Sequence, residues 1–252
     1  MFEAGLWGLV GASSLLIGAV IGARAGLPDR VIGLILGFGA GTLVSALSFE
    51  LTEEAFRLGG ADVVAIGLAS GALAYYAGSV ALARRGAAAR MAASGRSDTE
   101  ESSALLLGAV LDGIPESAVI GISLLEGGEV GLPILAAVFL SNLPEAISSS
   151  QGMCAQGVGV RRVLARWTVV ALTCAAAAAA GYALLEGASD DVIGLLQAFA
   201  GGAVLTMLAD TMFPESYRLT RDEDKPHPFF DKAVGLFTVL GFAVAYLLSM
   251  LE

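Results

Sequence analysis

The sequence predicts an all-α integral membrane protein with eight transmembrane helices, built from inverted repeats and with both termini outside. The first observation behind this prediction is composition: 56% of the 252 residues are hydrophobic, 15% are charged, and the mean hydropathy is +0.77, unlike a soluble domain. The second is the presence of 33 glycines, because small residues let membrane helices approach closely. The third is a series of charge-free runs long enough to cross a bilayer.

Six runs contain no Asp, Glu, Lys or Arg and reach the length of about 20 residues that a helix needs to cross a bilayer core. Two further apolar stretches are interrupted by acidic residues in their interiors. We therefore expect one transmembrane domain over 1–252, with an Ala/Ser/Gly/Arg-rich cytoplasmic linker at 86–102. The expected helices cover 4–23, 31–52, 63–83, 103–125, 131–154, 164–185, 192–215 and 233–251.

The orientation follows from the basic residues, because cytoplasmic loops of membrane proteins carry an excess of Lys and Arg. If the N-terminus lies outside, every one of the 14 basic residues except Arg57 falls on the cytoplasmic side. The short loops on the opposite side carry mainly acidic residues. We therefore expect a multi-pass protein of the plasma or inner membrane with both termini outward.

Two pairs of segments resemble each other within the chain. Residues 37–56 align with 198–217, which matches Gly41 with Gly202. Residues 112–117 and 141–146 both contain Pro-Glu at the same place. In the expected topology the members of each pair run in opposite directions, which is the relation between inverted repeats of secondary transporters.

Acidic residues in apolar helices indicate a functional site, because a charged group at mid-membrane costs roughly 2.5 to 3.5 kcal/mol on insertion scales. Asp112 and Glu116 are one helical turn apart, as are Ser141 and Glu145, with Asn142 beside them. No basic residue lies at a matching depth, so these carboxylates either bind a cation or hold protons in a packing role. We expect these five residues to form a cation site, in which Pro115 and Pro144 free backbone carbonyls as further ligands.

Two other acidic residues, Glu50 and Asp210, lie within apolar helices at nearly equivalent places of the first repeat pair. They could line an entrance or exit path, or they could be solvated, and the sequence favours neither interpretation. The only histidine, His227, lies in a polar loop, and Cys154 and Cys174 lack the spacing of a metal or redox motif.

Composition also excludes functions. A net charge of −10 excludes nucleic acid as a partner, since binding to phosphates needs a basic surface. The chain has no HExxH motif, and its single histidine is remote from any membrane serine, so we expect no enzymatic activity. No cofactor is expected.

The two Pro-Glu motifs, the Phe199-x-x-Gly202 and Pro-Glu-Ser pattern of the seventh helix, and eight spans with outward termini resemble the ZIP family of divalent metal transporters. The resemblance covers nearly the whole chain and implies a two-metal site between helices four and five and a homodimer. Some positions depart from the family pattern. Asp112 and Gly113 replace His-Asn, Ser141 and Asn142 replace His-Glu, and Cys174 stands at the position of a helix-six glutamate.

These departures leave a harder, oxygen-rich site that suits Mn²⁺, Fe²⁺ or Mg²⁺ at least as well as Zn²⁺, and one ion is the simpler expectation. The expected function is divalent cation transport by alternating access, with the metal ion and the bilayer as partners. The alternative is a transport-inactive, ZIP-like membrane interaction or regulatory protein with a degenerate site. Retention of costly intramembrane carboxylates favours transport.

Overall fold

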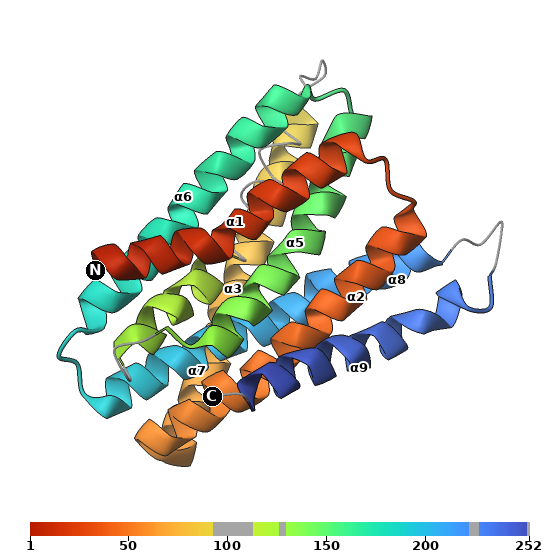
Figure 1. The fold of residues 1–252 in the computed structure, drawn as a ribbon. Helices are drawn as coiled ribbons and strands as arrows, with labels where there is room; N and C mark the ends of the chain where they lie inside the picture. The colour runs from red at the N-terminus through yellow and green to blue at the C-terminus, as the bar shows by residue number, and fades with distance from the viewer. Residues whose placement is uncertain (93–112, 126–129, 222–226, 251–252) are drawn as a thin grey trace.

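A computed structural model describes residues 1–92, 113–125, 130–221 and 227–250, with the backbone alone for 85–92. These parts of the chain are helical and contain no β-strand, as expected (Figure 1). The elements in chain order are α1 (Phe2–Arg24), α2 (Asp29–Ala46), the π-helix η1 (Leu47–Thr52), α3 (Glu53–Ala92), an apolar helix Gly113–Leu125, α5 (Leu132–Ala155), α6 (Val160–Leu185), α7 (Asp190–Met207), the π-helix η2 (Leu208–Met212), α8 (Phe213–Thr220) and α9 (Phe230–Ser249).

Within the described residues, six helical stretches are long and apolar enough to cross a membrane. One of them, Asp29–Arg84, holds two of the expected spans, which are separated at Gly60, where φ is 73° and ψ is −173°. The helix Gly113–Leu125 is shorter, and the rest of the expected fourth span lies outside the described residues. The composition and these helices make the chain a multi-pass membrane protein.

The predicted start of the linker, residue 86, is too early. Helix α3 continues to Ala92, and the remainder of the linker lies outside the described residues. The reason is local: 87–89 and 92 are alanines, which have the highest helix propensity, so the helix can extend beyond an apolar span.

The internal repeat is also present in the secondary structure. A shift of 161 positions takes both ends of α2, Asp29 and Ala46, to the two ends of α7, Asp190 and Met207. The same shift takes the start of η1 to the start of η2. Two π-helices at equivalent positions are unusual, because the π-helix is rare and is found mostly as single turns at functional sites.

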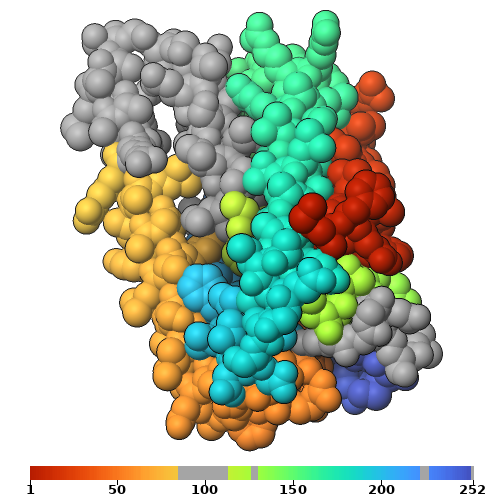
Figure 2. All heavy atoms as spheres, turned by 90° about the vertical axis from the view of Figure 1, so that its left-hand side faces the viewer, coloured from red at the N-terminus to blue at the C-terminus, as the bar shows by residue number. Residues whose placement is uncertain are grey.

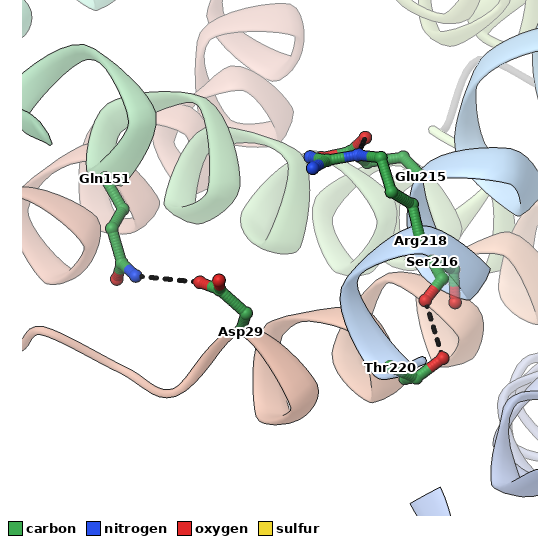
Figure 3. Close-up of polar contacts among 6 residues, drawn as sticks. All are labelled: Asp29, Gln151, Glu215, Ser216, Arg218 and Thr220. Atoms are coloured by element: carbon green, nitrogen blue, oxygen red, sulfur yellow. Dashed lines mark hydrogen bonds and ion pairs between the residues drawn. The ribbon is translucent and has the colours of Figure 1, made fainter. Parts of the chain in front are cut away.

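The ends of these two long helices repeat as well. Arg57 forms an ion pair with Glu54 one turn earlier, and Arg218 forms the equivalent pair with Glu215, at positions related by the same shift. Between them, buried Ser216 donates a hydrogen bond to the carbonyl of Gly33 at 2.6 Å, while Thr220 donates to the carbonyl of Ser216 at 3.0 Å (Figure 3). The bond from Ser216 to Gly33 attaches α8 to α2, and the bond from Thr220 to Ser216, drawn in Figure 3, lies within α8.

The helices pack as two groups. The first contains α2, α3, α7 and α9, in which α3 packs on α7 and α2 packs on α9. The second contains α1, α5 and α6 with helix Gly113–Leu125, in which α1 packs on both α5 and α6, and Gly121 lies against the carbonyl of Ala178. The two groups meet mainly where α2 contacts α5.

The outer faces of the bundle are apolar. Figure 2 shows α6 running along one face between α3 and α1, where Val169, Leu172 and Leu184 are exposed. Helix α9 is similarly peripheral, with five exposed apolar side chains. These are Leu236, Val239, Leu240, Val244 and Leu247. Faces of this kind suit contact with lipid tails rather than water.

Both termini are at the same end of the bundle, together with the turn between α6 and α7 (Figure 1). The opposite end carries the connection from α1 to α2, the turn between α5 and α6, and the connection from α8 to α9. These three connections are the ones flanked by Arg24, Arg30, Arg161, Arg162, Arg218, Arg221 and Lys232. These seven basic residues therefore gather at one end, whereas Arg57 and Arg84 of α3 flank none of the three connections.

Candidate cation site between helix 113–125 and α5

Glu116 lies in the first turn of helix Gly113–Leu125 and is almost fully buried, with 4% of its surface exposed. Pro115 precedes it, which suits the start of a helix because proline has no backbone N–H to leave unpaired there. Val119, Ile120 and Leu124 on the same helix are buried in an apolar cluster with residues of α1, η1, α5 and α7. The helix thus carries its carboxylate into the protein interior.

Helix α5 supplies the second carboxylate. Glu145 is half-buried, while Ser141 one turn earlier is 1% exposed. The Ser141 hydroxyl donates to the carbonyl of Val138 at 3.0 Å, which leaves its oxygen lone pairs available to a cation. Pro144 lies inside the helix, and α2 approaches closely here: a Cβ at Gly39 would lie 3.2 Å from the Leu140 carbonyl oxygen. The carbonyl freed by Pro144 is therefore covered by α2.

Cys174 of α6 is the residue on which both carboxylates act. The side chains of Glu116 and Glu145 both lie close enough to the Cys174 thiol to interact with it electrostatically, and Ser117 hydrogen-bonds to it. The sulfur lies 3.7 Å from the carbonyl oxygen of Gly113. The structure therefore places Glu116 and Glu145 within electrostatic reach of Cys174, which stands at the position where the sequence resemblance implies a glutamate.

Ser117 was not among the residues singled out from the sequence. It is 2% exposed and lies one turn after Gly113, whose missing side chain leaves room for Cys174: a Cβ at Gly113 would lie 2.8 Å from the sulfur. The sequence feature that could have identified Ser117 is its position directly after the Pro-Glu motif and one helical turn after Gly113.

Asn142 is a buried amide next to Ser141 on α5. It is 3% exposed, and its side-chain nitrogen has no hydrogen-bond partner in the described parts of the chain. An unpaired buried amide N–H costs about 1 to 3 kcal/mol, which favours a bound water or another acceptor beside it. Asn142 therefore fits a polar environment near the site better than a packed apolar one.

A small cavity of about 20 Å³ adjoins Glu116. Its volume is enough for one water, which needs about 10 to 15 Å³. Glu116 is the only ionisable side chain among the described residues of its wall. The remaining wall residues are apolar: Val119 lies on the same helix, and the others come from four other parts of the fold. The apolar wall residues are Leu43 and Ala46 of α2, Leu47 and Leu51 of η1, Val119, Ile134 and Val138, and Val204 of α7.

The fifth predicted ligand, Asp112, lies outside the described residues. Among the residues that are described, no group of three or more His, Cys, Asp or Glu side chains is close enough to hold a metal ion. The described part of the candidate site is thus two carboxylates, Glu116 and Glu145, with Ser141 and Asn142 alongside. These oxygens suit a hard divalent cation.

The possible pathway residues occupy the two π-helices, Glu50 in η1 and Asp210 in η2. Glu50 is half-buried and Asp210 is exposed. Leu47 and Leu51 of η1 line the cavity beside Glu116, but neither acidic residue does. Both therefore lie outside the cavity wall, at places of the repeat that differ by one residue, because the shift of 161 takes Glu50 to Thr211.

A comparison of the sequence with models of known protein families finds no match, and a comparison with curated proteins finds none either.

Proposed function

We propose that the protein transports a divalent cation across the membrane through a site formed by Glu116 and Glu145. The observation that carries the proposal is that buried Glu116 and half-buried Glu145, on two different helices of an apolar bundle, both interact electrostatically with buried Cys174. Carboxylates within apolar membrane helices are costly and mark ion pathways, so a divalent cation exchanged with solvent fits this pair.

The site chemistry supports a hard or borderline ion. The described donors are carboxylate, hydroxyl and amide oxygens, and the nearest sulfur is a thiol at a position where the resemblance to ZIP transporters implies a glutamate. Such ligands suit Mn²⁺, Fe²⁺ or Mg²⁺ and do not select Zn²⁺. We therefore take Mn²⁺ as the test ion.

The internal repeat supports alternating access. We infer eight transmembrane spans, counting the two in Asp29–Arg84 separately and including the helix that ends at Leu125, with both termini outside. In this arrangement the equivalent segments α2–η1 and α7–η2 run in opposite directions, as in transporters whose repeats exchange roles between outward and inward states.

The experiment uses the full-length protein in proteoliposomes that contain a Mn²⁺-sensitive dye. The unmodified protein should transport Mn²⁺ into the liposomes. Glu116→Gln or Glu145→Gln should abolish this uptake and also the thermal stabilisation of the protein by Mn²⁺, because the amide keeps the volume of the side chain but loses its charge. Glu186→Gln, at an exposed residue between α6 and α7, is the matched control and should retain both. Mn²⁺ entry that persists in both site variants would contradict the proposed site.

The same assay tests the alternative function. A transport-inactive relative would bind Mn²⁺, detected as thermal stabilisation that is lost in Glu116→Gln, and yet admit none. That outcome would overturn transport and favour a regulatory or interaction role for the same site.

A further inference from the structure

Three arginines occupy the first two turns of α6, at the end of the bundle that carries the turn between α5 and α6. Arg161 and Arg162 lie in the first turn and are exposed, and Arg166 lies in the second turn and is half-buried. We call these three residues the arginine cluster. Helix α1 packs on α6 and reaches the same end with its last turn, where exposed Arg24 adds a fourth positive charge (Figure 1).

The described part of the chain does not neutralise this cluster. The sequence contains no Asp or Glu between Glu145 and Glu186, so α6 and the turn before it carry positive charge only. None of the three arginines forms an ion pair with a described residue. Arg166 donates instead to the sulfur of Met153 at 3.6 Å, and a thioether is a weak acceptor without charge.

The start of α6 adds to the positive potential at the cluster. The backbone N–H groups at a helix start carry partial positive charge, which favours acidic residues there and disfavours arginines. Helix α7 follows this rule, with Asp190 and Asp191 in its first turn. Helix α6 begins after Gly159, without a side-chain cap and without an acidic residue in its first turn. An anion from outside the protein would offset the charge of the arginines in this turn.

Basic residues of the other group of helices, at the same end of the bundle, have partners within the protein. Arg218 forms an ion pair with Glu215, and Arg221 lies over the ring of Tyr217, with its guanidinium carbon 4.9 Å from the ring centroid. A bias of basic residues toward one side of the membrane therefore does not account for the arginine cluster, because neighbours with the same bias are paired.

The cluster leads into a lipid-facing surface of α6. Val169 follows Arg162 by seven residues and Leu172 follows Arg161 by eleven, so each lies on the same side of the helix as its arginine and about 10 to 17 Å along the axis. Val169 is 55% exposed and Leu172 is 57% exposed, on the outer face along which α6 runs in Figure 2. A ligand that contacts both surfaces has an anionic group and an apolar chain, which is the chemistry of a phospholipid.

We propose that the arginine cluster binds the headgroup of an anionic phospholipid, whose acyl chains lie along α6 at Val169 and Leu172. Guanidinium groups form paired, charge-assisted hydrogen bonds with phosphate oxygens, and basic clusters at the ends of membrane helices attract anionic lipids. The lipid site lies apart from the candidate cation site, so it can be tested without any measurement of transport.

The first test is native mass spectrometry of the full-length protein in a neutral detergent, with added phosphatidylglycerol or phosphatidylcholine of the same acyl chains. The unmodified protein should retain phosphatidylglycerol roughly tenfold better, because the choline group brings a positive charge to the arginines. Equal retention of the two lipids would overturn the site. Glycerol phosphate, which lacks acyl chains, should not displace the lipid, and displacement at equal concentration would assign the cluster to a soluble anion instead.

The second test compares two variants that lose the same charge at the same end of the bundle. Arg161→Gln combined with Arg162→Gln should lower the retention of phosphatidylglycerol roughly tenfold. Arg221→Gln combined with Lys232→Gln, also at exposed positions, is the matched control and should retain the lipid like the unmodified protein.

Thermal unfolding gives an independent measurement on the same two variants. Both should unfold at the midpoint of the unmodified protein in neutral detergent alone, because all four substituted side chains are exposed. Added phosphatidylglycerol should raise the midpoint of the control variant but not that of the α6 variant. Equal loss of lipid retention and of stabilisation in the two variants would show a general attraction to the basic end and overturn the proposed site.

Discussion

Gly41 of α2 and Gly202 of α7 occupy equivalent positions in the two repeats, and each lies directly against a backbone carbonyl of another helix. A Cβ at Gly41 would lie 1.9 Å from the carbonyl oxygen of Thr238, and one at Gly202 would lie 2.1 Å from that of Leu68. The pattern continues one turn away, where Gly71 lies against Phe199 and Gly241 against Phe38. A shift of 170 positions relates Leu68 to Thr238 and Gly71 to Gly241, so the whole interface is repeated.

These contacts predict the effect of adding one methyl group. Gly41→Ala or Gly202→Ala should lower the free energy of unfolding by about 1 to 3 kcal/mol, because the new methyl meets backbone that can move only with its helix. Gly235→Ala in α9, with open space around its Cβ, should be neutral or slightly stabilising. Thermal unfolding in detergent measures all three, and equal midpoints for Gly41→Ala and Gly235→Ala would refute the close packing.

A second prediction concerns the attachment of α5 to the connection between α1 and α2. The side-chain amide of Gln151 donates to the carbonyl of Leu27 at 2.8 Å and to the Asp29 carboxylate at 3.4 Å (Figure 3). Gln151→Leu should cost about 1 kcal/mol of stability, as for a typical lost hydrogen bond. Gln156→Leu, at an exposed position just after α5, is the control in the same thermal assay. A destabilisation no greater than the control's would show that the bond contributes nothing.

The third prediction is the orientation in the membrane. In a protein that carries Cys154→Ser and Cys174→Ser, Asp190→Cys should react with a membrane-impermeant thiol reagent in intact cells. Arg161→Cys should react only after the membrane is permeabilised. The reason is the concentration of basic residues at one end of the bundle. The reverse pattern of labelling would invert the proposed topology.

The fourth prediction is the number of bound ions. One divalent ion should bind per protein, because Gly113, Asn142 and Cys174 leave a second position without charged ligands, and two adjacent dications repel strongly. Calorimetry at saturating Mn²⁺ should give one site in the unmodified protein and in Cys174→Ser. Cys174→Glu, which restores an acid beside Glu116 and Glu145, should add a second site. Two sites in the unmodified protein would rule out the single-ion model.

Composition and charge-free runs were enough to predict helices and a membrane environment, because a span must satisfy its backbone hydrogen bonds internally and bury apolar side chains in lipid. The short alignment of 37–56 with 198–217 was also visible in the sequence, and it proved to mark a repeat that includes helix ends, π-helices and glycine contacts. The sequence reveals the helices and the repeat because span length, hydropathy and glycine content are properties of a single helix.

Only the tertiary structure determined which side chains of different helices contact each other. Nothing in the sequence places Cys174 beside Ser117 and Gly113, because those contacts join residues far apart in the chain through the packing of α6 on the helix that begins at Gly113. The same holds for the apolar residues that line the cavity beside Glu116. Burial depends on which neighbours cover a helix face, and the neighbours are chosen by close packing of whole helices rather than by the residues of the face itself.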